Sequence, residues 1–284
     1  MKYWVILLLC LGGATHALQV TDDRGVAVTF AQTPQRIVSM LPSLTESVCA
    51  MDQCHRLVGV DRYSNFPESL KNLPKLGGGL DPNIEAIVAL KPDVVLVAGK
   101  GRSTERLEAL GIKVVALETK THADVKRVLQ VLGVLLAVPD AQGADRLWRI
   151  IDSSMSAAAQ SLPAKAKTAR VYFEVSRGPY AAGESSFIGE TLTRLGVKNV
   201  VPARLGPFPR LNPEYVVRAN PDVIMIGDSS IVNAASYPGW SRINAVRTNH
   251  VCVFGVGDSD VVVRPGPRMA EAAHLMAKCL ETYE

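Results

Sequence analysis

Short apolar runs alternate with amphipathic segments along most of the chain. Many of the runs are rich in Val and Ile and have the length of a buried strand, whereas the segments between them carry turn residues or a helical repeat of apolar positions. We expect strands at residues 36–40, 56–60, 93–97, 113–117, 169–175, 222–226 and 250–254, and a terminal helix at residues 268–280. This alternation predicts an α/β fold with mostly parallel sheets.

The two halves of the chain contain the same helix–turn–strand pattern. Residues 83–97 read NIEAIVALKPDVVLV, and residues 212–226 read NPEYVVRANPDVIMI. Asn, Glu, Pro and Asp occupy the same positions in both segments. Asn can cap a helix, Glu complements the helix dipole, and Pro ends the helix before the strand. The repeat predicts two similar lobes with a cleft between them, where ligands commonly bind.

A continuous amphipathic stretch lies between the two halves. Pro139 stands at its start, and residues 140–162 carry apolar side chains at steps of three and four. A helix over this stretch would be about 35 Å long, enough to join two lobes as a strut and to keep their hinge motion small. The predicted organisation is a signal peptide at residues 1–17, an N-terminal lobe at residues 18–137, a connecting helix at residues 138–164 and a C-terminal lobe at residues 165–284.

Residues 1–17 have the form of a cleavable signal peptide. Lys2 precedes an apolar run at residues 3–11, which is about half the ~20 residues that a bilayer span needs. Small side chains follow, and we place the cleavage after Ala17. Cys10 is the alternative, as the site of a lipid anchor, but Leu9 stands where a lipobox has Gly, Ala or Ser. We therefore expect a periplasmic protein.

The region of the first predicted helix carries two local signals. Pro42 favours a helix start, and Ser43 with Glu46 three residues later has the form of a capping box. Cys49 and Cys54 lie five residues apart across the expected end of this helix. In an oxidising compartment they can form a local disulfide, or they can remain small buried thiols.

Composition and motifs exclude several classes of function. The formal net charge is only +4, with 31 Lys and Arg against 27 Asp and Glu, and no basic run is interleaved with aromatic residues. Nucleic acid is therefore not an expected partner. The sequence contains no Gly-x-Ser-x-Gly elbow, no Gly-x-x-x-x-Gly-Lys loop and no His-Glu-x-x-His motif. We expect no catalytic residues, no cofactor and no direct metal site.

Aromatic and cationic residues gather in loops after the predicted strands. In α/β proteins ligands bind in the crevice at the carboxyl ends of the strands. Tyr and Phe offer flat apolar faces, and Arg and Lys donate charge-assisted hydrogen bonds. The loops are residues 61–66, 100–102, 177–180, 207–210 and 258–264. Each loop alone can be an ordinary solvated turn, but their recurrence at successive strand ends predicts a binding site.

Together these segments resemble the helical-backbone, or class III, substrate-binding proteins of ABC importers, a family with vitamin B12, siderophore and haem receptors. The resemblance runs from Pro34 to the C-terminus. It rests on residues 36–39 with 42–46, residues 58–60 with 63–67, residues 83–85 through 92–93, and residues 264–268. It implies a monomeric carrier that captures a metal chelate and delivers it to the transmembrane subunits of an importer.

The resemblance also implies roles for individual residues. The ligand contacts of the B12-binding members fall on Pro42, Tyr63, Tyr180, Phe208, Asp260 and Arg264. The importer-docking carboxylates fall on Glu85 and Glu214, which can otherwise be ordinary helix-start glutamates. Cobalamin or a related corrinoid is the expected ligand. Haem or a ferric siderophore is the alternative, with Tyr63 or Tyr180 as an axial ligand of haem iron. A periplasmic enzyme acting on a chelate is the rival from another class.

Two departures from the family pattern concern the cleft and a disulfide. Gly79 and Gly99 stand where the B12-binding members have tryptophan, so the wall of the cleft is expected to differ. Cys279 matches one end of a disulfide in those members, but the other end falls near Leu195 and is not cysteine. The sequence leaves the state of Cys252 and Cys279 open.

Overall fold

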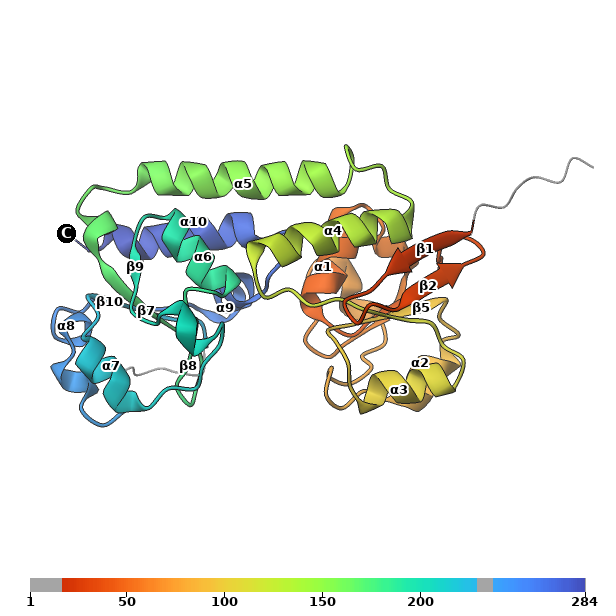
Figure 1. The fold of residues 1–284 in the computed structure, drawn as a ribbon, viewed down its shortest axis with the longest axis horizontal. Coiled ribbons are helices and arrows are strands. Elements are labelled where there is room, and N and C mark those ends of the chain that lie inside the picture. The colour runs from red at the N-terminus through yellow and green to blue at the C-terminus, as the bar shows by residue number, and fades with distance from the viewer. Residues whose placement is uncertain (1–16, 229–236, 284) are drawn as a thin grey trace, which may run out of the picture.

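Two α/β lobes lie side by side and are joined along one edge by helices (Figure 1). This computed structural model describes residues 17–228 and 237–283. The predicted signal peptide lies outside the described residues except for Ala17. The predicted fold class, two α/β lobes with mostly parallel sheets, is confirmed. Within the described ranges no helix is long and apolar enough to cross a membrane.

The N-terminal lobe is built on a parallel four-stranded sheet in the order β4-β3-β5-β6. Its strands are β3 (Ile37–Ser39), β4 (Leu57–Val60), β5 (Val94–Val97) and β6 (Val114–Ala116). Its helices are α1 (Pro42–Ala50), α2 (Ile84–Ala89), α3 (Arg102–Ala109) and α4 (His122–Leu136). The carboxyl ends of parallel strands meet at one edge of the sheet, which places the loops that follow β4, β5 and β6 next to one another.

An antiparallel hairpin of β1 (Leu18–Thr21) and β2 (Ala27–Phe30) precedes this sheet and was not predicted. The buried apolar residues of the hairpin are only Val20, Val28 and Phe30, so its apolar pattern is too short to stand out in the sequence. The register pairs Leu18 with Phe30.

The C-terminal lobe has a five-stranded sheet in the order β11-β10-β7-β8, with β9 also paired to β7. All pairs are parallel except β7 with β8. The strands are β7 (Arg170–Ser176), β8 (Tyr180–Ala181), β9 (Lys198–Asn199), β10 (Val223–Ile226) and β11 (Val251–Val253). The helices are α6 (Phe187–Arg194), α7 (Pro213–Ala219), α8 (Asn244–Arg247), α9 (Val256–Val263) and α10 (Met269–Glu281). Short 3-10 helices span Cys54–Arg56, Glu68–Asn72, Ala166–Thr168, Ala203–Leu205 and Trp240–Arg242.

Helix α5 (Ala144–Ser161) connects the lobes and runs along α10 (Figure 1). It begins later than predicted, because residues 140–143 form a turn in which the N–H groups of Gln142 and Gly143 both donate to Pro139 O at 2.9 Å. The helix is therefore about 27 Å long rather than 35 Å. Its apolar face, which includes Ile151 and Met155, is fully buried.

The repeated segments fold into matching units, as predicted. The side chain of Asn83 accepts a hydrogen bond from the backbone at the start of α2, and Asn212 does the same at the start of α7. Each helix is followed by a residue with a left-handed backbone, Lys91 (φ 46°) after α2 and Asn220 (φ 43°) after α7, just before the Pro of the repeat. The capping role that the sequence assigned to Asn is confirmed in both lobes.

The Asp of the repeat has a function that the sequence did not reveal. Asp93 Oδ2 accepts hydrogen bonds from the N–H groups of Gln35 and Arg36, at the start of β3. Asp222 Oδ2 accepts one from the N–H of Arg170, at the start of β7. In each lobe this carboxylate therefore ties the repeat to the neighbouring strand.

The predicted capping box at the start of α1 is wrong. The N-cap residue is Leu41, and no side chain caps the helix. Ser43 Oγ is buried without a hydrogen-bond partner among the described residues, and Glu46 turns away from the helix backbone to bind arginines of the other lobe. Two buried guanidinium groups are stronger partners for a carboxylate than one backbone N–H.

The described residues contain two disulfides. Cys49 and Cys54 are bonded across the end of α1, with a Cα–Cα distance of 4.3 Å. Cys252 and Cys279 join β11 to α10, with a Cα–Cα distance of 6.1 Å. The partner of Cys279 is thus on the edge strand of the sheet rather than near Leu195. A cross-link of this kind typically stabilises a domain by about 2–4 kcal/mol.

Candidate functional site

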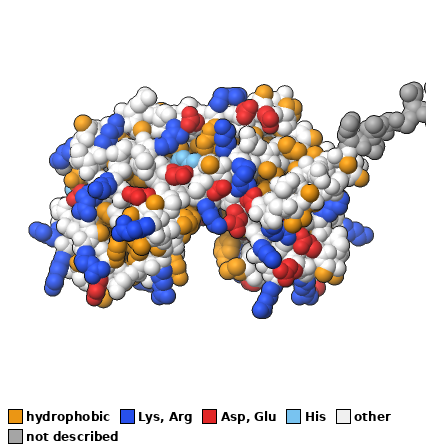
Figure 2. All heavy atoms as spheres, in the orientation of Figure 1, with side chains coloured by type: hydrophobic (Ala, Val, Ile, Leu, Met, Phe, Trp, Pro, Cys, Tyr) orange, Lys and Arg blue, Asp and Glu red, His pale blue; other side chains and the backbone are white. Residues whose placement is uncertain are grey.

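A cavity of about 650 Å³ lies between the lobes and receives side chains from both. Figure 2 shows the surface hollowed between the lobes, with apolar side chains on both walls. The residues that line it are Leu41, Pro42, Ser43, Tyr63, Ala98, Glu118, Thr119, Lys120, Val175, Phe187, Phe208, Asp260, Val263, Arg264 and Pro265. We call this space the first chamber.

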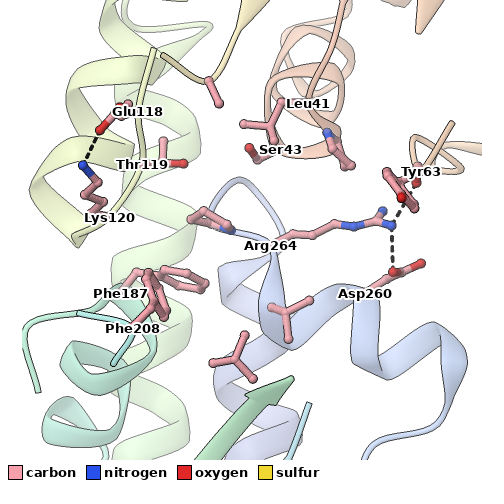
Figure 3. Close-up of a pocket in the computed structure, with 15 residues that line it drawn as sticks. Leu41, Ser43, Tyr63, Glu118, Thr119, Lys120, Phe187, Phe208, Asp260 and Arg264 are labelled. Carbon is pink, nitrogen blue, oxygen red and sulfur yellow. Dashed lines mark hydrogen bonds and ion pairs between the residues drawn. The ribbon is translucent and has the colours of Figure 1, made fainter. Parts of the chain in front are cut away.

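The C-terminal lobe contributes an aromatic wall. The rings of Phe187 and Phe208 lie with their centroids 6.0 Å apart and face the chamber (Figure 3). Phe187 stands at the first position of α6, and Val175 lies near the carboxyl end of β7, so the wall is held by regular structure. Apolar and aromatic surface of this extent suits a large flat ligand with an apolar face.

Five of the six predicted ligand-contact residues line the first chamber: Pro42, Tyr63, Phe208, Asp260 and Arg264. The structure does not bring the sixth residue, Tyr180, to this chamber. It lies on the short strand β8, is 40% exposed, and has the guanidinium of Arg210 5.9 Å from its ring centroid.

Arg264 is engaged by the N-terminal lobe. Its side chain is 8% exposed, and Figure 3 shows it extending toward Tyr63 and Asp260. Its Nη1 donates to Glu46 Oε1 at 2.9 Å and to Asn65 Oδ1 at 2.8 Å. Its Nη2 donates to the carbonyl oxygen of Tyr63 at 3.0 Å and pairs with Asp260 Oδ1 at 2.7 Å. Because both Nη atoms already donate to protein oxygens, Arg264 holds the two lobes together at the edge of the chamber.

Glu46 and Arg268 complete this arrangement. The Glu46 carboxylate is 3% exposed and accepts from Arg268 Nε and Nη2 at 2.9 and 2.8 Å. Burial by itself would lower the pKa of Arg268, but the hydrogen bonds and charge of Glu46 outweigh it and raise the pKa. We call this group the interlobe ion cluster; it consists of Glu46, Asn65, Asp260, Arg264 and Arg268. It fixes the relative position of α1 and the segment from α9 to α10.

The segment between β6 and α4 lines the chamber but was missed in the sequence. Glu118 and Lys120 form an ion pair there (Figure 3), and the hydrogen bond and charge of Glu118 raise the pKa of Lys120. The carbonyl oxygen of Lys120 accepts from the N–H of Phe187 at 2.7 Å, which is a second link between the lobes. The position of these residues directly after a predicted strand was a usable signal.

His122 strengthens this second link and is not placed to bind a ligand. Its Nε2 lies 2.9 Å from the carbonyl oxygen of Phe187 and 3.0 Å from Thr191 Oγ1, and burial lowers its pKa. No histidine lines the first chamber among the described residues. Nor do the described residues contain a group of three or more His, Cys, Asp or Glu able to hold a metal ion.

A second chamber of about 690 Å³ continues from the first on the side of the N-terminal lobe. The two chambers share Leu41, Pro42, Tyr63, Ala98 and Glu118. Its remaining walls are mainly residues 79–82 and the loop from β5 into α3 at residues 97–104. A Cβ atom at Gly99 would lie 2.6 Å from Glu118 Oε1, and one at Gly79 would lie 3.4 Å from the carbonyl oxygen of Met40. At Gly99 that space is already taken by the side chain of Glu118, whereas Gly79 leaves room in the chamber that a side chain would occupy.

The predicted docking glutamates occupy corresponding positions in the two lobes. Glu85 is in the first turn of α2 and Glu214 in the first turn of α7, and both are exposed. Glu85 pairs loosely with Arg106 at 3.2 Å. Both helices lie on the side of the molecule away from α5 (Figure 1).

Comparison with known proteins gives matches across both lobes. The family model described as periplasmic binding protein matches residues 37–255. An uncharacterized ABC transporter substrate-binding lipoprotein of Bacillus subtilis, YvrC, is 30% identical over 276 residues, which cover 92% of this chain and 84% of the relative. A vitamin B12-binding protein of Pectobacterium atrosepticum is 27% identical, over 84% of this chain and 86% of the relative. The solved structure of a periplasmic haem-binding protein from Pseudomonas aeruginosa has a TM-score of 0.71 at 25% identity, over 88% of this chain and 93% of that one.

Proposed function

This chain belongs to the family of periplasmic binding proteins, and we propose that it captures a bulky metal chelate between its lobes and delivers it to the transmembrane subunits of an ABC importer. The observation that carries the proposal is the first chamber, which lies between the lobes and combines an aromatic wall with apolar side chains. Binding proteins commonly place their ligand at such an interface between domains.

Cobalamin or a related corrinoid is the leading ligand. The relative from Pectobacterium atrosepticum is named for vitamin B12 binding, and it matches over both lobes. Pro42, Tyr63 and Phe208 line the chamber and offer flat or apolar surfaces to a macrocycle. The two chambers together have the volume to accept a ligand larger than an ordinary metabolite.

Haem is the second candidate, and the position of Tyr63 favours it. Tyr63 is 62% exposed and is the one tyrosine that lines either chamber in the described part of the chain. A phenolate oxygen is an axial ligand that proteins use for haem iron. Tyr180 is not placed for this role, because it lies outside both chambers.

We propose that binding involves no covalent step. The lining of the first chamber contains neither histidine nor cysteine in the residues described, and the carboxylate of Glu118 is engaged by Lys120. Catalysis on a chelate would require a nucleophile beside a base, or a redox group. The protein therefore acts as a carrier, with Glu85 and Glu214 as docking carboxylates, one on each lobe.

The experiment that tests this function is retention of a coloured ligand. Purified mature protein is incubated separately with cyanocobalamin, haemin and a ferric siderophore, passed through a desalting column and examined by absorption spectroscopy. We expect one of these chelates to remain bound at about one equivalent. Loss of colour with all three would contradict the proposed function. If haemin is retained, Tyr63→Phe should change its charge-transfer absorption, whereas Tyr180→Phe should not.

A further inference from the structure

Two cations without protein partners border the second chamber. Lys100 and Arg102 lie in the loop that leads from β5 into α3, and both line this chamber and are exposed. Within residues 17–228 and 237–283 neither side chain has a hydrogen-bond or ion-pair partner. Most of the other cations near the cleft are paired, as Arg264, Arg268 and Lys120 are.

The carboxylates of the second chamber do not neutralise these two cations. Glu118 is paired with Lys120. Asp61 is fully buried and accepts hydrogen bonds from the N–H of Tyr63 and from the hydroxyl of Ser64. On the α3 side of the chamber the two cations therefore have no carboxylate paired with them among the described residues, and their charge attracts an anionic group to that side.

The start of α3 adds hydrogen-bond donors at the same place. Gly101 is its N-cap, and no side chain caps the helix, so N–H groups of its first turn lack an intrahelical partner. Ser103 also lines the chamber and contributes a hydroxyl. The dipole of the helix favours negative charge at this end. Lys100, Arg102 and the hydrogen-bond donors at the start of α3 therefore lie on the same wall of the second chamber.

We propose that the second chamber is a subsite for an anionic arm of the ligand, a carboxylate or a phosphate ester, which Lys100 and Arg102 bind while the ring system of the ligand occupies the first chamber. The shared lining of the two chambers allows one ligand to span both. Gly79 leaves open space in which the arm can lie. This inference rests on the proposed function and identifies the ligand more narrowly than "metal chelate".

The test compares pairs of chelates in which one member carries an anionic group and the other does not. Cyanocobalamin, which has a nucleotide phosphate, is compared with dicyanocobinamide, which lacks it, and haemin is compared with haemin dimethyl ester. Each is titrated calorimetrically into wild type and the Lys100→Gln/Arg102→Gln variant. For the pair that wild type binds, we expect the variant to lose about tenfold in affinity for the anionic member and to bind the neutral member as wild type does. The pair in which the variant loses affinity for the anionic member identifies whether the arm is a phosphate or a carboxylate.

A matched control removes two positive charges from the same lobe outside both chambers. Lys71→Gln/Arg106→Gln changes the net charge equally, and neither residue lines a chamber. The inference predicts wild-type affinity for this control. Equal losses in the control and in the Lys100→Gln/Arg102→Gln variant would overturn it, because the effect would then be a general one of net charge.

A size variant tests the space independently of charge. Gly79→Trp should fill part of the second chamber and lower the affinity for the anionic chelate several-fold. Gly79→Ala should leave that affinity unchanged, because its Cβ makes only a 3.4 Å contact. Unchanged affinity of the anionic member in both the charge and the size variants would overturn the subsite while leaving the proposed function intact. A wild-type protein that binds neither pair and no ferric siderophore would overturn the proposed function, and the subsite with it.

Discussion

Glu174 is a carboxyl group buried in the sheet of the C-terminal lobe, outside both chambers. Tyr237 Oη donates to its Oε1 at 2.7 Å, and Tyr172 Oη lies 3.4 Å from its Oε2. Burial raises its pKa from 4.5 to about 7, and the nearby charge of Asp228 adds to the shift while Arg177 opposes it. The group is thus protonated in the folded protein over a pH range where it is ionised in the unfolded chain.

Glu174 should make stability depend on pH. Since its folded-state pKa lies above its unfolded value, its contribution is complete below pH 4.5 and is lost as the pH rises to about 7. Glu174→Gln keeps a neutral group, so its free energy of unfolding relative to wild type should rise by about 2–3 kcal/mol between pH 5 and pH 8. Urea unfolding at both pH values measures this. Glu281→Gln, at an exposed position, should show no such change, and parallel pH curves for wild type and Glu174→Gln would contradict the assignment.

Single residues differ in how far the sequence could place them. Phe208 and Asp260 reach the first chamber because they stand in loops or helices beside strand ends, where motifs are informative. Tyr180 has the same kind of sequence position, but the antiparallel strand β8 carries it to Arg210 instead. The position of a side chain on a two-residue strand depends on how that strand pairs with its neighbour, and a single sequence does not specify this pairing.

Elements from different lobes are joined by the interlobe ion cluster. Glu46 of α1 and Arg264 are 218 positions apart in the chain, yet they are hydrogen bonded at 2.9 Å with both side chains buried. Removing one partner of a buried ion pair leaves an uncompensated charge, which costs more than losing an exposed pair. The cluster therefore holds the lobes in a fixed arrangement at one edge of the cleft.

Glu46→Ala should lower the free energy of unfolding by about 3–5 kcal/mol, since it leaves Arg264 and Arg268 without their shared carboxylate. Equilibrium unfolding in urea measures the loss. Glu105→Ala removes an exposed carboxylate of α3 and should change stability by less than about 0.5 kcal/mol. A loss of under about 1 kcal/mol in Glu46→Ala would mean that the cluster does not stabilise the fold.

Strands with long apolar runs were predicted well from the sequence, whereas a short hairpin and the exact start of a helix were not. The strands of both sheets with continuous apolar runs were found, whereas the hairpin of β1 and β2 was not, because few of its side chains are buried. The start of α5 was misplaced because a turn at residues 140–143 follows Pro139. The pairing of Cys252 with Cys279 depends on how α10 lies against the sheet, which is a tertiary property.

At the scale of the whole molecule, three links restrict movement of the lobes. These are α5 packed along α10, the interlobe ion cluster, and the contact of the segment after β6 with α6. Bending α5 would break backbone hydrogen bonds in its interior. The architecture therefore favours small adjustments around a ligand over wide opening and closing.

Solution scattering should detect this stiffness. We expect the radius of gyration of the mature protein to change by less than about 1 Å when it is saturated with the chelate that it retains. A decrease of several ångströms on ligand binding would contradict a stiff connection. Glu46→Ala should give a larger difference between the two states than wild type, because it weakens one of the three links.

Docking should depend on both lobes at once. Glu85→Ala with Glu214→Ala should abolish uptake of the chelate by cells that have the partner importer, while calorimetry gives an unchanged affinity, because neither residue lines a chamber. A control with Glu105→Ala and Glu281→Ala removes one exposed carboxylate from each lobe and should transport normally. Uptake at the wild-type rate in the Glu85/Glu214 variant would exclude these residues as docking contacts.

Capture of a chelate between the lobes is tested most directly by calorimetric titration of wild type and Phe208→Ala with cyanocobalamin, haemin and a ferric siderophore. Wild type should saturate at one site with one of these ligands. Phe208→Ala, which removes part of the aromatic wall, should raise its Kd about tenfold. Flat titrations with every chelate, or the same Kd for both proteins, would contradict binding in the cleft.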